Sequence, residues 1–109
     1  MQNIHFTTTL DQVWNPQRIY LGSNLWIGDK VWFAVSSNRS DSKLVIKDKV
    51  RIGRFSEIDA LQSIILEDGV ETAENVYISD NTHAYNDINR FIRDQEVEYT
   101  GAVVIGSGT

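Results

Sequence analysis

Residues that are nearly all bulky and apolar recur along the chain at six-residue steps, in three groups of three. They are Leu21, Ile27 and Phe33, then Ile46, Ile52 and Ile58, and then Leu66, Thr72 and Ile78, with Ile105 opening a further unit; Thr72 is the one exception. A period of six matches neither the 3.6-residue repeat of an α-helix nor the two-residue alternation of one long strand. The pattern instead predicts short strands that meet at corners, with the repeating residue of each unit pointing inward.

The position after each repeating residue is often small. Small residues there are Gly22, Gly28, Ala34, Gly53, Ala73, Ser79 and Gly106. A small residue suits a tight corner, and Gly in particular tolerates positive φ and close backbone approach. Three six-residue units then close one triangular turn of 18 residues. Successive turns are expected to stack about 4.8 Å apart through the hydrogen bonds of parallel strands.

The interruptions of the repeat follow a rule. The steps that exceed six residues run from Phe33 to Ile46, from Ile58 to Leu66 and from Ile78 to Ile105, and the excess is seven, two and twenty-one residues. Each follows the third unit of a group, so all three insertions are predicted to leave at the same vertex, as insertions in a solenoid do. The expected fold is therefore an all-β, triangular parallel solenoid. An antiparallel β-sandwich, the alternative, would show alternation with turn signals every 8–12 residues.

The chain divides into two predicted parts. Residues 1–20 lack the repeat and are expected to form an N-terminal cap over the open end of a solenoid that occupies residues 21–109. The polar stretch 84–102 is expected to be one long loop. Because the sequence ends five residues into a unit, at Thr109, we expect the chain to be a fragment that is truncated at its C-terminus.

Composition removes several functional classes. The chain has 109 residues, which is the size of one domain, and its net charge of −5 with scattered basic residues gives no basic footprint for nucleic acid. It has no cysteine, which excludes a disulfide framework and a thiol nucleophile. The apolar runs are too short for a membrane span, and the first residues do not form a signal peptide. A cytoplasmic location is the expectation.

Several segments carry a resemblance to a known family. The units Ile-Gly-Asp-Lys-Val-Trp at 27–32 and Ile-Gly-Arg-Phe-Ser-Glu at 52–57 resemble the hexapeptide-repeat acyltransferases. With Val-Tyr-Ile-Ser-Asp-Asn-Thr-His-Ala-Tyr-Asn-Asp at 76–87 and Gly-Ala-Val-Val-Ile-Gly at 101–106, the chain is similar to sugar and polysaccharide O-acetyltransferases and to maltose O-acetyltransferase. The resemblance implies a left-handed parallel β-helix, a homotrimer, and acetyl-CoA lying between neighbouring subunits. The left hand comes from the resemblance alone, because parallel crossovers are normally right-handed.

The same resemblance assigns roles to residues around the start of the long loop. His83 corresponds to the general base, which would take the proton of an acceptor hydroxyl while that oxygen attacks the thioester carbonyl. Asp80 and Asn81 would contact the acceptor, or else serve the turn, as Asx residues often do. Asn81 stands where relatives often show a second His. One carboxylate, of Asp80 or Asp87, would orient the imidazole, and Tyr85 would stack on a sugar ring or anchor the loop.

Other interpretations remain open. Trp26 and Trp32 end successive units and are expected to point outward, either as a paired subunit contact or as cover for the N-terminal cap. A zinc hydro-lyase of the γ-carbonic anhydrase type needs three His ligands, but only His83 lies within the repeats, so no metal is expected. A non-catalytic, trimeric assembly module with an incomplete cofactor cleft is the alternative function. The residues that bind CoA are not identifiable from the sequence.

Overall fold

The computed structural model describes residues 4–6, 12–37, 39–83, 97–99 and 101–109, and the regular secondary structure of these residues is almost entirely β-strand. The strands are β1 (Ile4–Phe6), β2 (Gln12–Trp14), β3 (Ile19–Leu21), β4 (Leu25–Ile27), β5 (Trp32–Val35), β6 (Lys43–Ile46), β7 (Arg51–Ile52), β8 (Glu57–Ala60), β9 (Ser63–Leu66), β10 (Tyr77–Ser79), β11 (Asn81–His83), β12 (Val97–Tyr99) and β13 (Val103–Ile105). One 3-10 helix, η1 (Pro16–Arg18), precedes β3. Among these residues no helix could cross a membrane.

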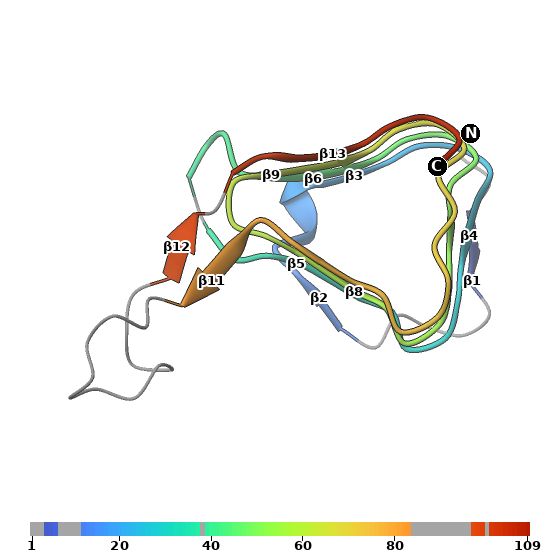
Figure 1. Cartoon of the computed structure of the whole chain (residues 1–109), viewed down its shortest axis with the longest axis horizontal. Helices are drawn as coiled ribbons and strands as arrows, with labels where there is room; N and C mark the ends of the chain where they lie inside the picture. The colour runs from blue at the N-terminus through green and yellow to red at the C-terminus, as the bar shows by residue number, and fades with distance from the viewer. Residues whose placement is uncertain (1–3, 7–11, 38, 84–96, 100) are drawn as a thin grey trace.

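Three parallel sheets make up most of the fold. Their strand orders are β1-β4-β7, β10-β8-β5-β2 and β13-β9-β6-β3, and β11 and β12 form a separate antiparallel pair. The chain visits the three parallel sheets in turn, and the sheets lie as three sides around one interior (Figure 1). The all-β class with parallel strands, predicted from the six-residue period, is confirmed.

The register of the sheets reproduces the spacing of the repeat. Ile27 pairs with Ile52, and their separation of 25 positions equals the expected turn of 18 residues plus the seven-residue insertion. Ile46 pairs with Leu66, 20 positions later, which is the same turn and the two-residue insertion. Equivalent units are therefore neighbours across the sheets. A slip of one residue would turn every inward side chain outward, so burial of the repeating residues specifies this register.

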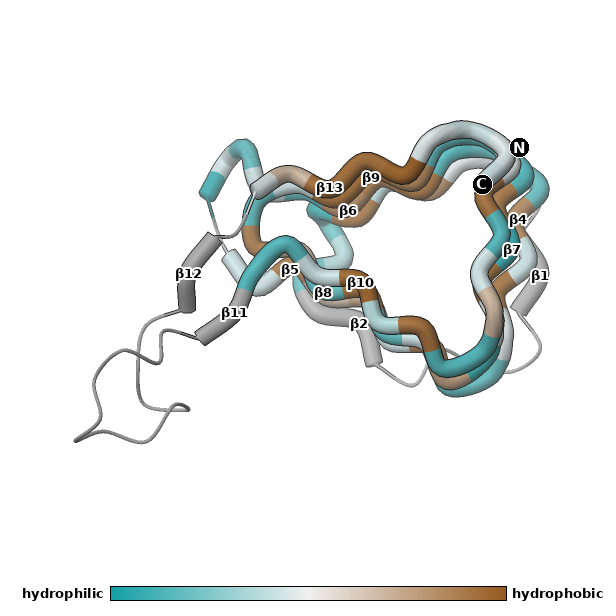
Figure 2. The backbone as a smooth tube through the Cα atoms, viewed as in Figure 1, coloured by the Kyte–Doolittle hydropathy of each residue, from teal (hydrophilic) through white to brown (hydrophobic). Residues whose placement is uncertain are grey.

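The repeating positions supply part of the core. Ile27, Phe33, Ile46, Ile52, Ile58 and Leu66 are at most 1% exposed, and Leu21, Ile78 and Ile105 pack partly buried against them. Thr72, the polar member of the series, is half-buried. Figure 2 shows the hydrophobic positions gathered along the strands and the hydrophilic ones at the turns. Each fully buried Ile, Leu or Phe side chain contributes about 1.5–3 kcal/mol. The same buried cluster also contains Leu25, Val31, Val35, Leu44, Val50, Ala60, Ile64 and Val70.

The prediction for the glycines at the corners is correct for close backbone contact and wrong for positive φ. Gly28 and Gly53 do sit at close backbone contacts, because a Cβ on Gly28 would lie 2.6 Å from the Arg54 nitrogen and one on Gly53 would lie 2.4 Å from the Ala73 carbonyl oxygen. Neither glycine has positive φ, however. The left-handed residues come two positions later, at Lys30 (φ 53°) and Phe55 (φ 60°).

The same corner position is left-handed at every described corner that carries no insertion. It is three residues after the inward residue and is occupied by Asn24, Lys30, Lys49, Phe55, Gly69, Asn75 and Gly108. A left-handed residue other than Gly costs roughly 1–2 kcal/mol. The packed strands on either side of each corner offset that cost, which is why Lys and Phe are found there as well as Asn and Gly.

The three insertions leave the fold at one junction, as predicted. Residues 36–42 join β5 to β6, residues 61–62 join β8 to β9, and residues 80–102 join β10 to β13. Because β5, β8 and β10 share one sheet and β6, β9 and β13 share the next, all three connections lie between the same two sheets (Figure 1). The stretch predicted as a plain loop, 84–102, contains β12, which pairs with β11; residues 84–96 and 100 lie outside the described residues.

The N-terminal segment contributes the first strand of each parallel sheet. β1, β2 and β3 stand at the ends of the three strand orders. In the register, Phe6 lies opposite Ile27 and Val13 lies opposite Phe33. Backbone pairing thus continues through a segment in which the six-residue repeat is not visible. The division of the chain at residue 20 stays a prediction.

Replacing Gly53 by Ala is expected to lower the free energy of unfolding by about 1–3 kcal/mol, because the new Cβ would meet backbone atoms of the next turn and the stack must shift. Denaturant unfolding followed by circular dichroism measures the change. The matched control is Gly106→Ala, where the added Cβ would meet nothing within 4 Å, and a change within about 0.5 kcal/mol is expected. Equal effects of the two substitutions would contradict this account of the corners.

Candidate functional site

Asp80 lies at the point where the longest insertion leaves β10. Its side chain is 0% exposed. One carboxylate oxygen, Oδ1, accepts a hydrogen bond from the backbone N–H of Leu61 at 2.6 Å. The other, Oδ2, accepts from the backbone N–H groups of Gln62 at 3.0 Å and Ser63 at 2.8 Å. The Asp80 carboxylate, which belongs to the next turn of the chain, therefore holds the backbone of the two-residue insertion at 61–62 in place.

This arrangement satisfies three backbone donors that a tight turn would otherwise leave without partners. The sequence left two roles open for Asp80, contact with the acceptor or stabilisation of a turn. These hydrogen bonds correspond to the second role. A carboxylate with both oxygens engaged and no exposed surface has little capacity to bind a ligand directly. The predicted contact between Asp80 and an acceptor, and its role in orienting the imidazole, stay predictions.

Asn81 ties the start of β11 to β8. Its Nδ2 donates to the backbone carbonyl of Asp59 at 3.1 Å and to Oδ1 of Asp80 at 3.1 Å. Its backbone N–H donates to Oγ of Ser79 at 3.1 Å, and that hydroxyl donates to the Asn81 carbonyl at 3.0 Å. Asp80 and Asn81 together hold the root of the long insertion in one place.

The backbone of His83 lies at the end of β11, opposite Val97 of β12. It is three residues beyond the buried Asp80, at the base of the long insertion, where the sequence placed it. Tyr85 and Asp87 lie outside the described residues. Asp80, Asn81 and His83 are neighbours along the chain, and the catalytic role of His83 stays a prediction.

The predicted pairing of Trp26 and Trp32 is wrong. Successive six-residue units belong to successive sides of the fold, so Trp26 lies in β4 and Trp32 in β5, which are strands of different sheets. The guanidinium of Arg51 stacks over the Trp26 ring at 5.1 Å from its centroid. The two indoles therefore do not form one aromatic patch.

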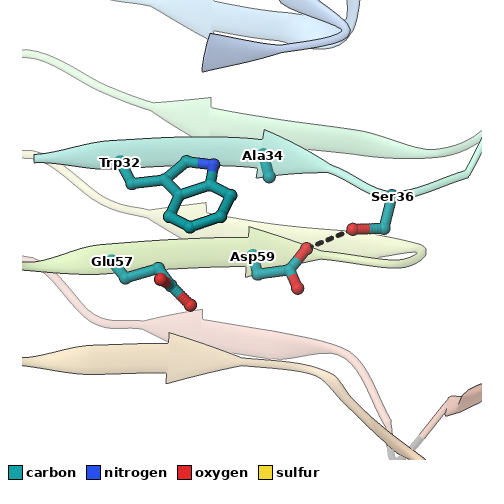
Figure 3. A pocket seen from close by; sticks show the side chains of 5 residues that line it. All are labelled: Trp32, Ala34, Ser36, Glu57 and Asp59. Atoms are coloured by element: carbon teal, nitrogen blue, oxygen red, sulfur yellow. Dashed lines mark hydrogen bonds between the residues drawn. The ribbon is translucent and has the colours of Figure 1, made fainter. Parts of the chain in front are cut away.

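A surface pocket of about 210 Å³ lies on the outer side of β5 and β8, and the sequence reasoning missed it. It is lined by Trp32, Ala34, Ser36, Glu57 and Asp59 (Figure 3). The available signal was the alternation in β8, where Ile58 and Ala60 face inward and are buried, while Glu57 and Asp59 are only half-buried. Outward polar residues at alternate positions of a strand are ordinary, which is why they did not stand out.

The pocket contains two carboxylates, those of Glu57 and Asp59, and none of its described lining residues is basic. The Ser36 hydroxyl donates to Oδ1 of Asp59 at 2.5 Å. Burial, and after it the negative charge of Asp59, raises the pKa of the Glu57 carboxyl above its ordinary value. In the described ranges, the ion pairs are Arg39–Asp41, Lys47–Glu67, Arg51–Glu71 and Arg54–Glu74, so neither pocket carboxylate has a cationic partner there.

No group of three or more His, Cys, Asp or Glu side chains in the described part of the chain could hold a metal ion. Comparison with known proteins found no family model, no curated protein and no solved structure that matches the chain. The candidate site accordingly consists of two neighbouring parts, defined by residues of this chain alone. One is the root of the long insertion at 80–83, and the other is the pocket on β5 and β8.

Replacing Asp80 by Asn is expected to lower the free energy of unfolding by about 2 kcal/mol or more, because an amide nitrogen cannot accept and at least one buried backbone N–H loses its partner. Chemical denaturation provides the measurement. Asp41→Asn is the control, since that side chain is 53% exposed and its contacts, with Arg39 and with the side-chain amide of Gln62, are both at the surface. A destabilisation no larger than that of the control would show that the buried carboxylate does not hold the turn.

The carboxyl of Glu57 is expected to titrate above the ordinary pKa of a glutamate when followed by carbon-13 NMR. Asp59→Asn should lower this pKa only part of the way, because burial is the larger cause. Since the folded state then holds the proton more tightly than the unfolded state, the free energy of unfolding should fall as pH rises through the Glu57 pKa. Glu57→Gln should remove that part of the fall. A pKa at or below the ordinary value would contradict the prediction.

Proposed function

We propose that the protein is an acetyl-CoA-dependent O-acetyltransferase that acts on a hydroxyl group of a sugar or polysaccharide precursor. In this proposal its fold is a left-handed parallel β-helix of hexapeptide repeats. The observation that carries the proposal is the buried six-residue repeat in three parallel sheets, interrupted at one junction by an insertion that begins beside His83. The proposed reaction, acetyl transfer from acetyl-CoA, rests on the resemblance of the repeat units and of the segment at 76–87 to the hexapeptide-repeat acyltransferases.

His83 is the general base of the proposed reaction. A neutral imidazole takes the proton of the acceptor hydroxyl as the oxygen forms a bond to the acetyl carbon, and the bond between that carbon and the CoA sulfur breaks. The proton then passes from the imidazolium to the departing thiolate. An imidazole with an ordinary pKa near 6.5 is suited to both steps at neutral pH. A backbone N–H would stabilise the oxyanion, as in other acyl transfers.

The hydrogen bonds of Asp80 and Asn81 support this assignment. A catalytic group acts well only when its backbone is held in position. The Asp80 carboxylate and the Asn81 amide fix the first residues of the insertion to the turn at 61–63 and to β8. The strand that carries His83 therefore leaves the sheets from a rigid point.

An exposed apolar row supports assembly into a homotrimer with acetyl-CoA between subunits. On the outer face of the sheet β13-β9-β6-β3, Tyr20, Val45, Ile65 and Val104 lie directly opposite one another on neighbouring strands. Tyr20 is 56% exposed and Val104 is 59% exposed. A continuous apolar row on a surface is typical of an interface. The row equally suits the alternative function, a non-catalytic assembly module, because association needs no catalysis.

Replacing His83 by Ala is expected to reduce acetyl transfer at least about 10²-fold, because general base catalysis is lost. Release of the CoA thiol from acetyl-CoA, with glucose, galactose and maltose as acceptor probes, measures the rate. His5→Ala, at the other histidine of the chain, is the control and should leave the rate unchanged. Full activity of the His83 variant would remove His83 from the mechanism. Calorimetry that detects no binding of acetyl-CoA to the unmodified chain would favour the assembly module.

A further inference from the structure

The outer face of β8 carries an arrangement that the proposed transfer reaction does not use. Trp32 of β5, Glu57 of β8 and Tyr77 of β10 lie directly opposite one another on three neighbouring parallel strands. Neighbouring strands are about 4.8 Å apart, so side chains on one face at these positions are in reach of one another. A carboxylate is therefore placed between two aromatic residues, and the Tyr77 residue is 61% exposed.

A second carboxylate lies beside the first. Asp59 is two positions further along β8, on the same face, and lies opposite Ala34. Ser36 donates to its Oδ1, which leaves Oδ2 without a hydrogen bond from the described residues. Figure 3 shows the Glu57 and Asp59 side chains next to the indole ring of Trp32. The two carboxylates and the indole thus border one hollow.

The charge of this hollow is not compensated by the residues that the structure describes. Elsewhere on the turns, acidic and basic residues pair across neighbouring strands, as Lys47 does with Glu67 at 2.7 Å and Arg54 with Glu74 at 2.8 Å. Glu57 and Asp59 have no such partner there, although Glu57 is only half-exposed and lies close to a like charge. A bound cation would supply the missing counter-charge.

The shape and the polar groups of the hollow select the kind of cation. Its volume of about 210 Å³ is below the roughly 300–1,000 Å³ of pockets for drug-sized ligands, so it fits a small ring or a short chain. Its free polar atoms are carboxylate oxygens, which only accept hydrogen bonds, and the Trp32 Nε1 is buried and therefore offers no donor to a ligand. An aromatic and aliphatic floor of Trp32 and Ala34 suits an organic cation better than a hydrated metal ion.

We propose that this pocket binds a small organic ammonium ion. The ammonium group donates hydrogen bonds to Glu57 and to Oδ2 of Asp59, and the body of the ligand packs on the Trp32 ring, where the cation also interacts with the π-system. Tyr77 lies opposite Glu57 on the neighbouring strand β10 and is not part of the pocket lining. Neither the binding nor its test depends on the proposed acetyl transfer.

Cyclohexylamine and cyclohexanol test the proposal, because they share a ring and differ in the charged group. Each is titrated into the nitrogen-15-labelled protein at neutral pH and low salt, and amide chemical shifts are recorded. Saturable shifts centred on Trp32, Glu57 and Asp59 are expected with cyclohexylamine, weakening as salt is added. Cyclohexanol should cause no saturable shift. Equal binding of the two probes, or no saturable shift with cyclohexylamine, would overturn the proposal.

Single substitutions locate the site. Glu57→Gln and Asp59→Asn should each weaken cyclohexylamine binding by about tenfold or more, because each removes a charge-assisted hydrogen bond. Both keep the size of the side chain, and the amide introduced by Asp59→Asn still offers an oxygen to Ser36, so the amide spectra should show an intact fold. Glu74→Gln is the matched control, since that carboxylate lies in another turn and pairs with Arg54. Unchanged affinity in both pocket variants would also overturn the proposal.

Discussion

The burial of apolar side chains from successive six-residue units in a shared interior is the constraint on which the rest of this structure depends. It sets the register of the three parallel sheets, because Ile27, Ile52 and their equivalents can be covered only when equivalent units lie side by side. It also explains the close contacts at Gly28 and Gly53, where successive turns approach through their backbones. Stability and topology are therefore two consequences of the same periodic burial.

That constraint also accounts for where the insertions lie. All three occupy the junction after β5, β8 and β10, where the extra residues displace no inward side chain of the described strands. Candidate chemistry gathers at the same junction, with His83 in the longest insertion and Ser36 of the pocket in the first. The three insertions thus leave the stack of short strands between the same two sheets.

The sequence was sufficient to predict the inward positions and the common junction of the insertions, because both follow from spacing alone. It was not sufficient for the left-handed corner residues, since Lys30 and Phe55 have no intrinsic preference for that conformation and adopt it under packing. The pocket was missed because it joins Trp32 to Glu57, which are 25 positions apart and meet only through the register. The buried state of Asp80 was missed because its donors belong to a different turn of chain.

The hydrogen bonds of Asp80 link two features that are far apart in sequence. The turn at 61–62 presents backbone donors to the interior, and the carboxylate that accepts them comes from the residue that follows β10. Deleting Leu61 and Gln62 would remove two of the donors that hold the buried Asp80 carboxylate, and an apolar residue at 80 would leave the backbone donors of the turn without their acceptor. The two-residue insertion and the aspartate therefore depend on each other, so homologues that lack the insertion are expected to lack the aspartate as well.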